Sequence, residues 1–508
     1  MKLNSKDGFT TPSIGTFLSG KALDDLLLAG IEEKKKELIT HISSYDGRDL
    51  FPKWLELIRC IDELVNLRYV FPPAIWETAS NICIDLLEDD EGVFVYYLFG
   101  SLFGEDVCGR MMKLIHMLLR IKTKSKSMGI TDMDFRSIGE TVDFLQARRL
   151  YYVTYLTLIR LYAKGSRRIP FAELLCNFQY QIDFNMRPIT TALHAIIESS
   201  NIEGFGATVR DFGLEFTKPY KQLDDFFLEP QVMNELDILE YERIGDVSLS
   251  GHRLPPSLYS YEELQYTITQ VEKVFGVFGV SSSLVLSDAK RMVDDLKETV
   301  VDGYSVVMSE EEFKAFSLNY PHLILDSIAT DYFEALNERP AFFRFNDHYY
   351  SNVLLIIRFI ENTFYGLLRR NRRFRIKAGF VFEKKVKALL EEYGFDSTET
   401  KRIHHQEFDV ICLKDGRAYN FQCKNNFLDI NALNTHNIVR ISRQNKKLVK
   451  YYVKALEKEN LRTKLVQEYF GVNCVENYVV TRFPVVMEHE RLIPFNQLED
   501  WLKKNKVG

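Results

Sequence analysis

The sequence predicts a large all-α N-terminal body followed by a smaller C-terminal α/β domain with the element order α-β-β-β-α-β-β-α. Two observations predict this division. Up to about residue 368, apolar residues recur at intervals of three and four, as they do along one face of a helix. From about residue 370 the pattern changes to short segments in which apolar and polar residues alternate, as they do in strands.

The helical part is interrupted where proline and glycine cluster. The clearest helical patterns cover residues 23–42, 51–70 and 148–164. Breaks are expected at 71–73, 164–170 and 186–188. Residues 246–260 combine Gly, Ser and a pair of prolines, which is typical of a linker. We therefore expect a helical domain at 1–245, a linker at 246–260, a second helical block at 261–368 and the α/β domain at 369–508.

The C-terminal part opens with a strong helical pattern over residues 374–395, in which Gly394 is placed to cap the end. Three alternating segments follow at 396–405, 407–416 and 417–426. Asp415-Gly416, between the last two, is a preferred dipeptide of tight hairpins. The pattern then predicts a helix, two strands and a closing helix at 443–460, 475–483, 491–495 and 496–504.

The charge changes at the same place as the pattern. The chain of 508 residues has a formal charge of −6, from 65 basic and 71 acidic residues. Residues 369–508 contain 28 Lys and Arg against 17 Asp and Glu, a net charge of +11, which leaves −17 on the rest. The basic end is typical of a surface that binds polyanions. For the acidic body, a protein partner or a second copy of the chain is the more plausible ligand.

The bulk features exclude several classes of protein. No stretch reaches the ~18 apolar residues of a membrane span, and the N-terminus lacks a secretory pattern. The seven cysteines lie far apart without a CxxC pair, which favours reduced core thiols over a disulfide framework. We therefore expect a cytoplasmic protein without membrane contact.

A group of polar residues near the predicted hairpin indicates phosphodiester chemistry. Asp409 lies near the start of one strand, and Gln422 and Lys424 share one face of the next. Glu383, on the preceding helix, adds a second carboxylate. Carboxylate and amide oxygens suit Mg²⁺, and a lysine beside such an ion can orient water and stabilise a phosphate in its transition state.

This arrangement resembles the PD-(D/E)XK nuclease superfamily, and most closely its Mrr-like restriction-endonuclease branch, in which the last motif often reads QxK. The resemblance covers about residues 374–504, a quarter of the chain. It includes Gly379, Phe382-Glu383, Gly394-Phe395, Glu407 with Asp409, and Gln422-Cys423-Lys424. Two departures are visible, since no proline precedes Asp409 and Gln422 replaces the acidic residue of the standard motif.

The resemblance implies a restriction-endonuclease-like fold and a role for each matching residue. Asp409 would be the principal metal ligand, helped by Gln422, Glu383 and the backbone carbonyl of Cys423. Lys424 would be the catalytic lysine, and Glu407 is an additional candidate. The implied activity is a Mg²⁺-dependent endonuclease, with Mn²⁺ as an alternative ion, double-stranded DNA as the expected substrate, and 5′-phosphate and 3′-hydroxyl products. Attachment of such domains to unrelated modules suggests a restriction or anti-phage defence effector.

Two other interpretations remain open at this stage. An Asp followed by QxK arises often by chance, so the domain could be a degenerate, non-catalytic copy that only binds nucleic acid. The substrate could also be RNA, because the residues do not distinguish an RNase from a DNase.

Two basic groups are candidates for nucleic-acid contacts. The first group lies directly before the Glu383 helix and consists of Arg369, Arg370, Arg372, Arg373, Arg375 and Lys377. The second group lies on the following helix and consists of Arg440, Arg443, Lys446, Lys447 and Lys450. Both could contact the phosphate backbone. The alternatives are a solvated junction and a solvated helix face.

Three further features are weaker candidates. His404 and His405 precede the hairpin and could approach the metal, although histidines in such places more often position backbone or contact phosphate. The side chain of Cys423 should point away from Gln422 and Lys424, as a core thiol. GTFLSGKA at 15–22 resembles a P-loop, but Ala22 replaces the required hydroxyl residue and no apolar strand is predicted before it.

Overall fold

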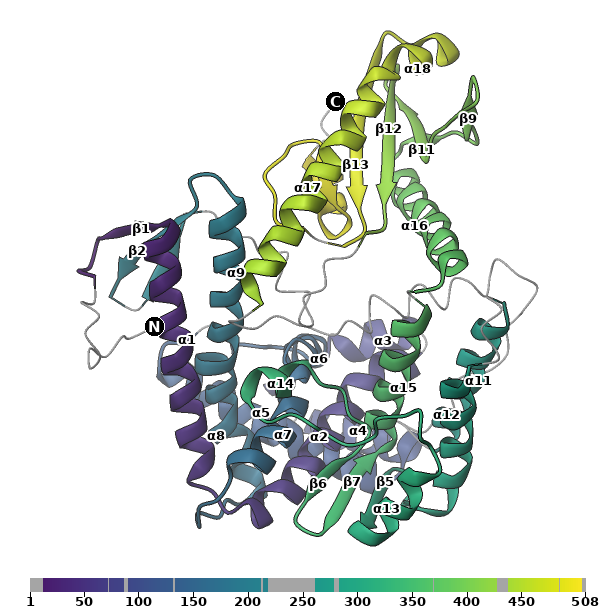
Figure 1. The fold of residues 1–508 in the computed structure, drawn as a ribbon. Coiled ribbons are helices and arrows are strands. Elements are labelled where there is room, and N and C mark those ends of the chain that lie inside the picture. Colours follow the sequence, from purple (N-terminus) through teal and green to yellow (C-terminus); the bar gives the residue numbers. More distant parts are fainter. Residues whose placement is uncertain are drawn as a thin grey trace.

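The computed structural model describes residues 12–71, 73–85, 90–130, 133–211, 213–217, 261–277, 283–368, 370–426, 437–483 and 485–504. The predicted linker at 246–260 and Arg369 lie outside these ranges. A largely helical body occupies the lower part of Figure 1, and the domain with the C-terminal mixed sheet lies above it. The coarse division into a helical body and an α/β end is therefore confirmed.

The N-terminal part of the body is a set of helices around a buried aromatic centre. Trp54 contacts Tyr155 and Phe178, with ring centroids 4.9 and 5.1 Å apart. α7 is buried along most of its length, because its apolar and aromatic residues occupy every face rather than one stripe. The helices are α1 (Gly20–Ser43), α2 (Gly47–Val70), α3 (Pro73–Ser80), α4 (Asp90–Phe103), α5 (Glu105–Ser127), α6 (Ile138–Gln146), α7 (Arg149–Tyr162), α8 (Leu174–Gln181) and α9 (Arg187–Asn201).

The break predicted at 186–188 is not a break in the structure. A π-helical turn, Ile182–Met186, joins α8 directly to α9. Pro188 lies in the first turn of α9, where a missing N–H leaves no helical hydrogen bond unmade. The chain therefore continues as one helical segment through the proline.

The expectation of an all-α body is wrong, because the body also contains two small antiparallel sheets. One has the order β1-β2-β3 and the other β4-β5-β7-β6. Their strands are β1 (Phe17–Ser19), β2 (Gly206–Arg210), β3 (Gly213–Phe216), β4 (Val300–Val301), β5 (Ser305–Ser309), β6 (Phe343–Phe345) and β7 (His348–Asn352). Each strand has two to five residues, which is too short for alternation to stand out from a helical background.

The second block of the body packs its helices on the four-stranded sheet. Its helices are α11 (Tyr261–Val277), α12 (Leu284–Asp295), α13 (Glu310–Leu318), α14 (Tyr332–Asn337) and α15 (Val353–Leu368). α15 contains the most apolar segment of this block and is buried within its core. Among the described helices, none combines the length and apolarity that crossing a membrane requires.

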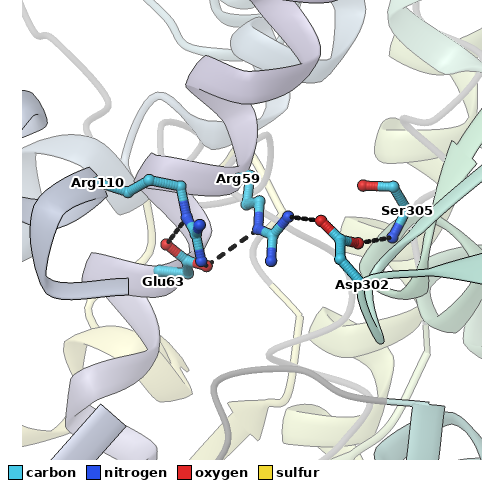
Figure 2. Close-up of polar contacts among 5 residues, drawn as sticks. All are labelled: Arg59, Glu63, Arg110, Asp302 and Ser305. Carbon is cyan, nitrogen blue, oxygen red and sulfur yellow. Dashed lines mark hydrogen bonds and ion pairs between the residues drawn. The ribbon is translucent and has the colours of Figure 1, made fainter. Parts of the chain in front are cut away.

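An ion-pair network around the buried Glu63 connects the two parts of the body (Figure 2). Glu63 of α2 accepts from both Arg110 of α5, at 2.7 Å, and Arg59, at 3.1 Å. Arg59 also pairs with Asp302 at 2.6 Å, in the turn between β4 and β5. The Asp302 carboxylate in turn accepts from the backbone N–H of Ser305 at 3.1 Å. Glu63 is thus a buried anion shared by two cations, one of which reaches the second block.

The C-terminal domain is built on a five-stranded mixed sheet with the order β14-β13-β12-β11-β8. β12 is antiparallel to β11 and parallel to β13, which is parallel to β14. The elements are α16 (Arg372–Glu392), β8 (Asp396–Ser397), β11 (Val410–Lys414), β12 (Arg417–Lys424), α17 (Ile438–Leu461), β13 (Cys474–Thr481), β14 (Leu492–Pro494) and α19 (Leu498–Lys504). Each predicted element has its counterpart in this order.

The domain also contains elements that the sequence patterns did not separate. A second small hairpin, β9 (Arg402–Ile403) and β10 (Gln406–Glu407), lies between β8 and β11, and α18 (Thr463–Phe470) follows α17. The predicted strand at 396–405 is therefore two short strands in different sheets. α17 begins five residues earlier than the predicted 443.

The first turns of α17 pack on the helical body. Ile438 and Ile441 join the core that α1, α2 and α9 form. Beside them, the side-chain amide of Asn201 on α9 donates to the Ser442 hydroxyl at 3.0 Å. The side-chain amide of Asn445 in turn donates to Oδ1 of Asn201 at 3.0 Å. These contacts hold α17 in a fixed position on α9.

The buried anion Glu63 gives the first prediction. Glu63→Ala should lower the free energy of unfolding by about 3 kcal/mol, because it leaves Arg59 and Arg110 as cations without their shared partner. Glu77→Ala, an exposed change on α3, should cost at most about 0.5 kcal/mol. Urea unfolding followed by tryptophan fluorescence measures both. Equal losses in the two variants would show that the network does not stabilise the body.

Candidate active site

The β11–β12 hairpin has the register that the sequence predicted. Its pairs run from Lys414 with Arg417 to Val410 with Phe421. Asp415 and Gly416 form the turn, both with positive φ, at +49° and +71°. Asp409 comes directly before the last pair, so it faces Gln422 across the open end of the hairpin.

Asp409 is held at this end by two hydrogen bonds. Its Oδ2 accepts from the backbone N–H of Cys423 at 2.7 Å and from the side-chain amide of Gln422. Since Gln422 uses its amide nitrogen here, its amide oxygen remains as the group that could face a cation. The register thus places Asp409 and Gln422 side by side, as binding of one metal ion by both residues would require.

Glu383 of α16 approaches the same place. Its side chain is 17% exposed, and Lys401 Nζ lies 3.8 Å from its Oε2. Burial and the negative charge of Asp409 raise the pKa of Glu383 to about 7. Burial also raises the pKa of Asp409, and the charge of Lys424 partly offsets this effect. The two carboxylates therefore share one partly desolvated environment.

Lys424 completes the group at the end of β12. Its positive charge lowers the pKa of both Glu383 and Asp409, in each case against the larger effect of burial. The Lys424 ammonium lies 5.9 Å from the centroid of the Tyr451 ring on α17. Its carbonyl accepts from the N–H of Arg482 at 2.8 Å, which extends the β12–β13 ladder past the last strand residues.

These donors fit a hard divalent cation. The two carboxylates, the Gln422 amide oxygen and the Cys423 carbonyl all offer oxygen atoms, which a hard cation prefers. The raised pKa values of Glu383 and Asp409 indicate that nearby positive groups of the protein do not fully offset the cost of burying these two negative charges. Among the described residues, no three His, Cys, Asp or Glu side chains gather as a metal-holding group. An ion here would therefore depend on few protein ligands, as Mg²⁺ does when it keeps several waters.

The three auxiliary candidates, His404, His405 and Glu407, lie on the β9–β10 hairpin. His404 and His405 occupy its turn with φ of +45° and +66°, and both are exposed. Glu407 is also exposed and pairs with Arg402. Its negative charge contributes to the raised pKa of Glu383, whereas its carbonyl accepts from Arg462. The described contacts thus place Glu407 near the site and assign no catalytic contact to His405.

The thiol of Cys423 packs against the core of the C-terminal domain. Burial raises the pKa of this thiol well above its ordinary value, so it stays protonated at neutral pH. The interpretation of Cys423 as a core thiol rather than a nucleophile is consistent with this placement.

Both predicted basic groups are exposed where the structure describes them. In the first, Arg370, Arg372, Arg373, Arg375 and Lys377 surround the start of α16, which Asn371 caps by accepting from the N–H of Arg373 at 2.9 Å. In the second, Arg440, Arg443, Lys446, Lys447 and Lys450 lie on the exposed side of α17. The opposite side of α17, with Ile441 and Asn445, is buried.

Sequence reasoning missed three residues at or under the site. Lys401 and Tyr451 reach Glu383 and Lys424 only through tertiary packing. The third residue is Asn420 of β12, whose side-chain amide donates to the buried carboxylate of Glu459 at 3.0 Å and to the side-chain oxygen of Asn477 at 2.9 Å. These hydrogen bonds link β12 to α17 and β13. No motif marks these residues. A buried Asn in the middle of a strand was the one visible signal.

Comparison with protein-family models, with curated proteins and with solved structures finds no match to this chain.

The raised pKa of Glu383 predicts a pH-dependent stability in EDTA. Between its ordinary pKa near 4.5 and about 7, the folded chain keeps a proton on Glu383 that the unfolded chain has lost. The free energy of unfolding therefore falls as pH rises through this window. Glu383→Gln removes this cost, so its Tm should rise relative to the parent between pH 5 and pH 8. Glu392→Gln, an exposed change on the same helix, should show no such trend. A pH-independent difference for Glu383→Gln would contradict the shared desolvated environment.

Proposed function

We propose that the chain is a Mg²⁺-dependent endonuclease of the PD-(D/E)XK type, with double-stranded DNA as its substrate. The observation that carries the proposal is the convergence at the open end of the hairpin. There Asp409 accepts from Cys423 and Gln422, and its negative charge helps to raise the pKa of Glu383. Chance alone explains an Asp and a QxK in sequence. It explains less well a helix carboxylate brought to the same point.

Each residue has a chemical role in this proposal. Asp409, Gln422, Glu383 and the Cys423 carbonyl would hold Mg²⁺, which would supply positive charge to the water and to the phosphate. The Lys424 ammonium stabilises the negative charge that develops on the phosphate oxygens. The ion would also lower the pKa of the attacking water, whose proton would pass to solvent. Water adds to phosphorus as the bond to the 3′ oxygen breaks, which leaves 5′-phosphate and 3′-hydroxyl ends.

The basic surfaces support binding of a nucleic-acid backbone beside this site. The arginines at the N-terminus of α16 lie at the positive end of the helix dipole. Without a ligand these like charges repel one another, whereas a bound phosphate would be attracted by both. On α17, the exposed cations continue toward Tyr451, which neighbours Lys424. Both surfaces thus lie on helices that also contribute to the candidate site, α16 through Glu383 and α17 through Tyr451. A role in restriction or anti-phage defence stays a prediction from the resemblance.

Substitution of the site residues tests the activity. Asp409→Asn and Lys424→Ala should each reduce Mg²⁺-dependent nicking of plasmid DNA by at least about 100-fold, because each removes charge that acts on the transition state. Lys384→Ala, next to Glu383 in sequence and exposed, should cleave like the parent. EDTA should abolish cleavage by the parent.

The outcomes separate the alternatives. Full cleavage by both folded site variants would overturn the assignment of the site. Cleavage of RNA but not DNA would show an RNase. Binding of DNA without any metal-dependent cleavage by the parent would show a non-catalytic domain.

Titration with salt in EDTA tests the α17 surface. The logarithm of the association constant for duplex DNA falls linearly with the logarithm of the salt concentration, and each phosphate contact contributes about 1 to the slope. For the double variant Arg443→Gln/Lys447→Gln, the slope should therefore be smaller in magnitude by about 2. Lys36→Gln/Lys297→Gln, which removes two exposed charges from the body, should leave the slope unchanged. Equal slopes for the parent and the α17 variant would show that this helix face is only solvated.

A further inference from the structure

A surface pocket of about 640 Å³ lies where three segments of the helical body meet. These segments are the start of α2, the loop 163–166 after α7, and the β6–β7 hairpin. Small-molecule sites occupy about 300–1,000 Å³. The hairpin lies at the bottom of Figure 1, whereas the C-terminal sheet lies at the top. The pocket is therefore separate from the candidate active site.

Two glycines allow the segments around the pocket to approach closely. A Cβ on Gly47 would lie 2.7 Å from the carbonyl oxygen of Ala163 and 2.9 Å from the Phe345 ring. A Cβ on Gly165 would collide with the carbonyl of Ser44. The N–H of Gly165 also donates to the Tyr45 carbonyl at 2.9 Å. This backbone contact fixes the walls of the pocket, so that the site is formed before a ligand arrives.

The pocket concentrates positive charge in a body of net negative charge. Its lining contains four cations, Arg48, Arg160, Lys164 and Arg344, against one carboxylate, Asp46. The Asp46 carboxylate already caps α2 by accepting from the N–H of Arg48 at 3.0 Å. It also faces Arg168, outside the lining, at 3.6 Å. The one acidic group is thus occupied elsewhere.

Two of these cations, Arg48 and Lys164, have no carboxylate partner among the described residues, whereas the charges of Arg160 and Arg344 also act on the carboxylate of Asp326. Arg344 pairs with Glu310 at 2.9 Å. By contrast, Lys164 donates to the Arg160 carbonyl at 3.1 Å, and Arg160 donates to Ser327 and to the Ala329 carbonyl, which are neutral acceptors. Among the described residues, none of Arg48, Arg160 and Lys164 forms an ion pair with a carboxylate. An anionic ligand would supply the missing negative charge.

The arrangement of the cations indicates the class of ligand. Guanidinium groups bind phosphate through paired N–H donors, and an ammonium adds a point charge. The cations come from separate segments around a pocket that exceeds the size of a single phosphate, and the exposed hydroxyl residue Ser166 also lines this pocket. We propose that this pocket binds a small molecule that carries two or more phosphate groups.

Calorimetric titration of the full chain in EDTA tests the proposal, with sodium pyrophosphate and ADP as probes. Sulfate at equal ionic strength is the control anion. Arg48→Gln/Lys164→Gln should weaken binding of the probes by about tenfold or more, because two cations without carboxylate partners are lost. Ser166→Glu, which adds a carboxylate and removes no cation, should weaken it as well. The exposed positions of all three residues favour retention of the fold.

The matched control is Lys36→Gln/Lys297→Gln, which lowers the net charge equally and should bind the probes like the parent. Duplex DNA should not displace them. The proposal is overturned if neither probe binds more tightly than sulfate, if the control variant loses as much affinity, or if DNA competes for the pocket. Because these measurements involve no catalysis, their failure would leave the nuclease proposal untouched.

Discussion

The hydrogen bond from the backbone N–H of Cys423 to Asp409 is the constraint on which the candidate site depends. It joins the residue before β11 to the last part of β12, so the register of the whole hairpin sets the position of the carboxylate. A slip of one residue would turn Gln422 and Lys424 to the opposite face. The Asp415-Gly416 turn at one end therefore fixes the chemistry at the other.

Two helices of the C-terminal domain are shared with the body. Phe374, Ala378 and Val381 of α16 pack in the core of the second block, and Phe382 begins the contacts with the C-terminal sheet. Glu383 thus follows the point at which α16 passes from one core to the other. α17 likewise has its first turns on α9 and later turns against β12 and β13. The position of the helix carboxylate relative to the sheet is set by packing on both sides.

Local chemistry made the hairpin, the Gly394 cap and the group of Asp409, Gln422 and Lys424 predictable from sequence. The cap has the expected positive φ of +77°. The sheet β4-β5-β7-β6 was not predictable, because its strands are short and some forty residues separate β5 from β7. Lys401 was missed for a related reason, since its contact with Glu383 depends on how the chain returns after α16. The charge counts change sign near the start of the α/β part, but they averaged away the basic pocket within the acidic body.

The shared helices have a consequence for any attempt to shorten the protein. A fragment that begins at α16 would lack the helical body, including α9. It would therefore expose Ile438, Ile441, Phe483 and Val486, which are buried in the core of the body in the intact chain. An excised C-terminal fragment would then present a contiguous apolar surface to water. Such a fragment would tend to aggregate for reasons unrelated to its catalytic residues. Its inactivity would therefore say nothing about the chemistry of the intact chain.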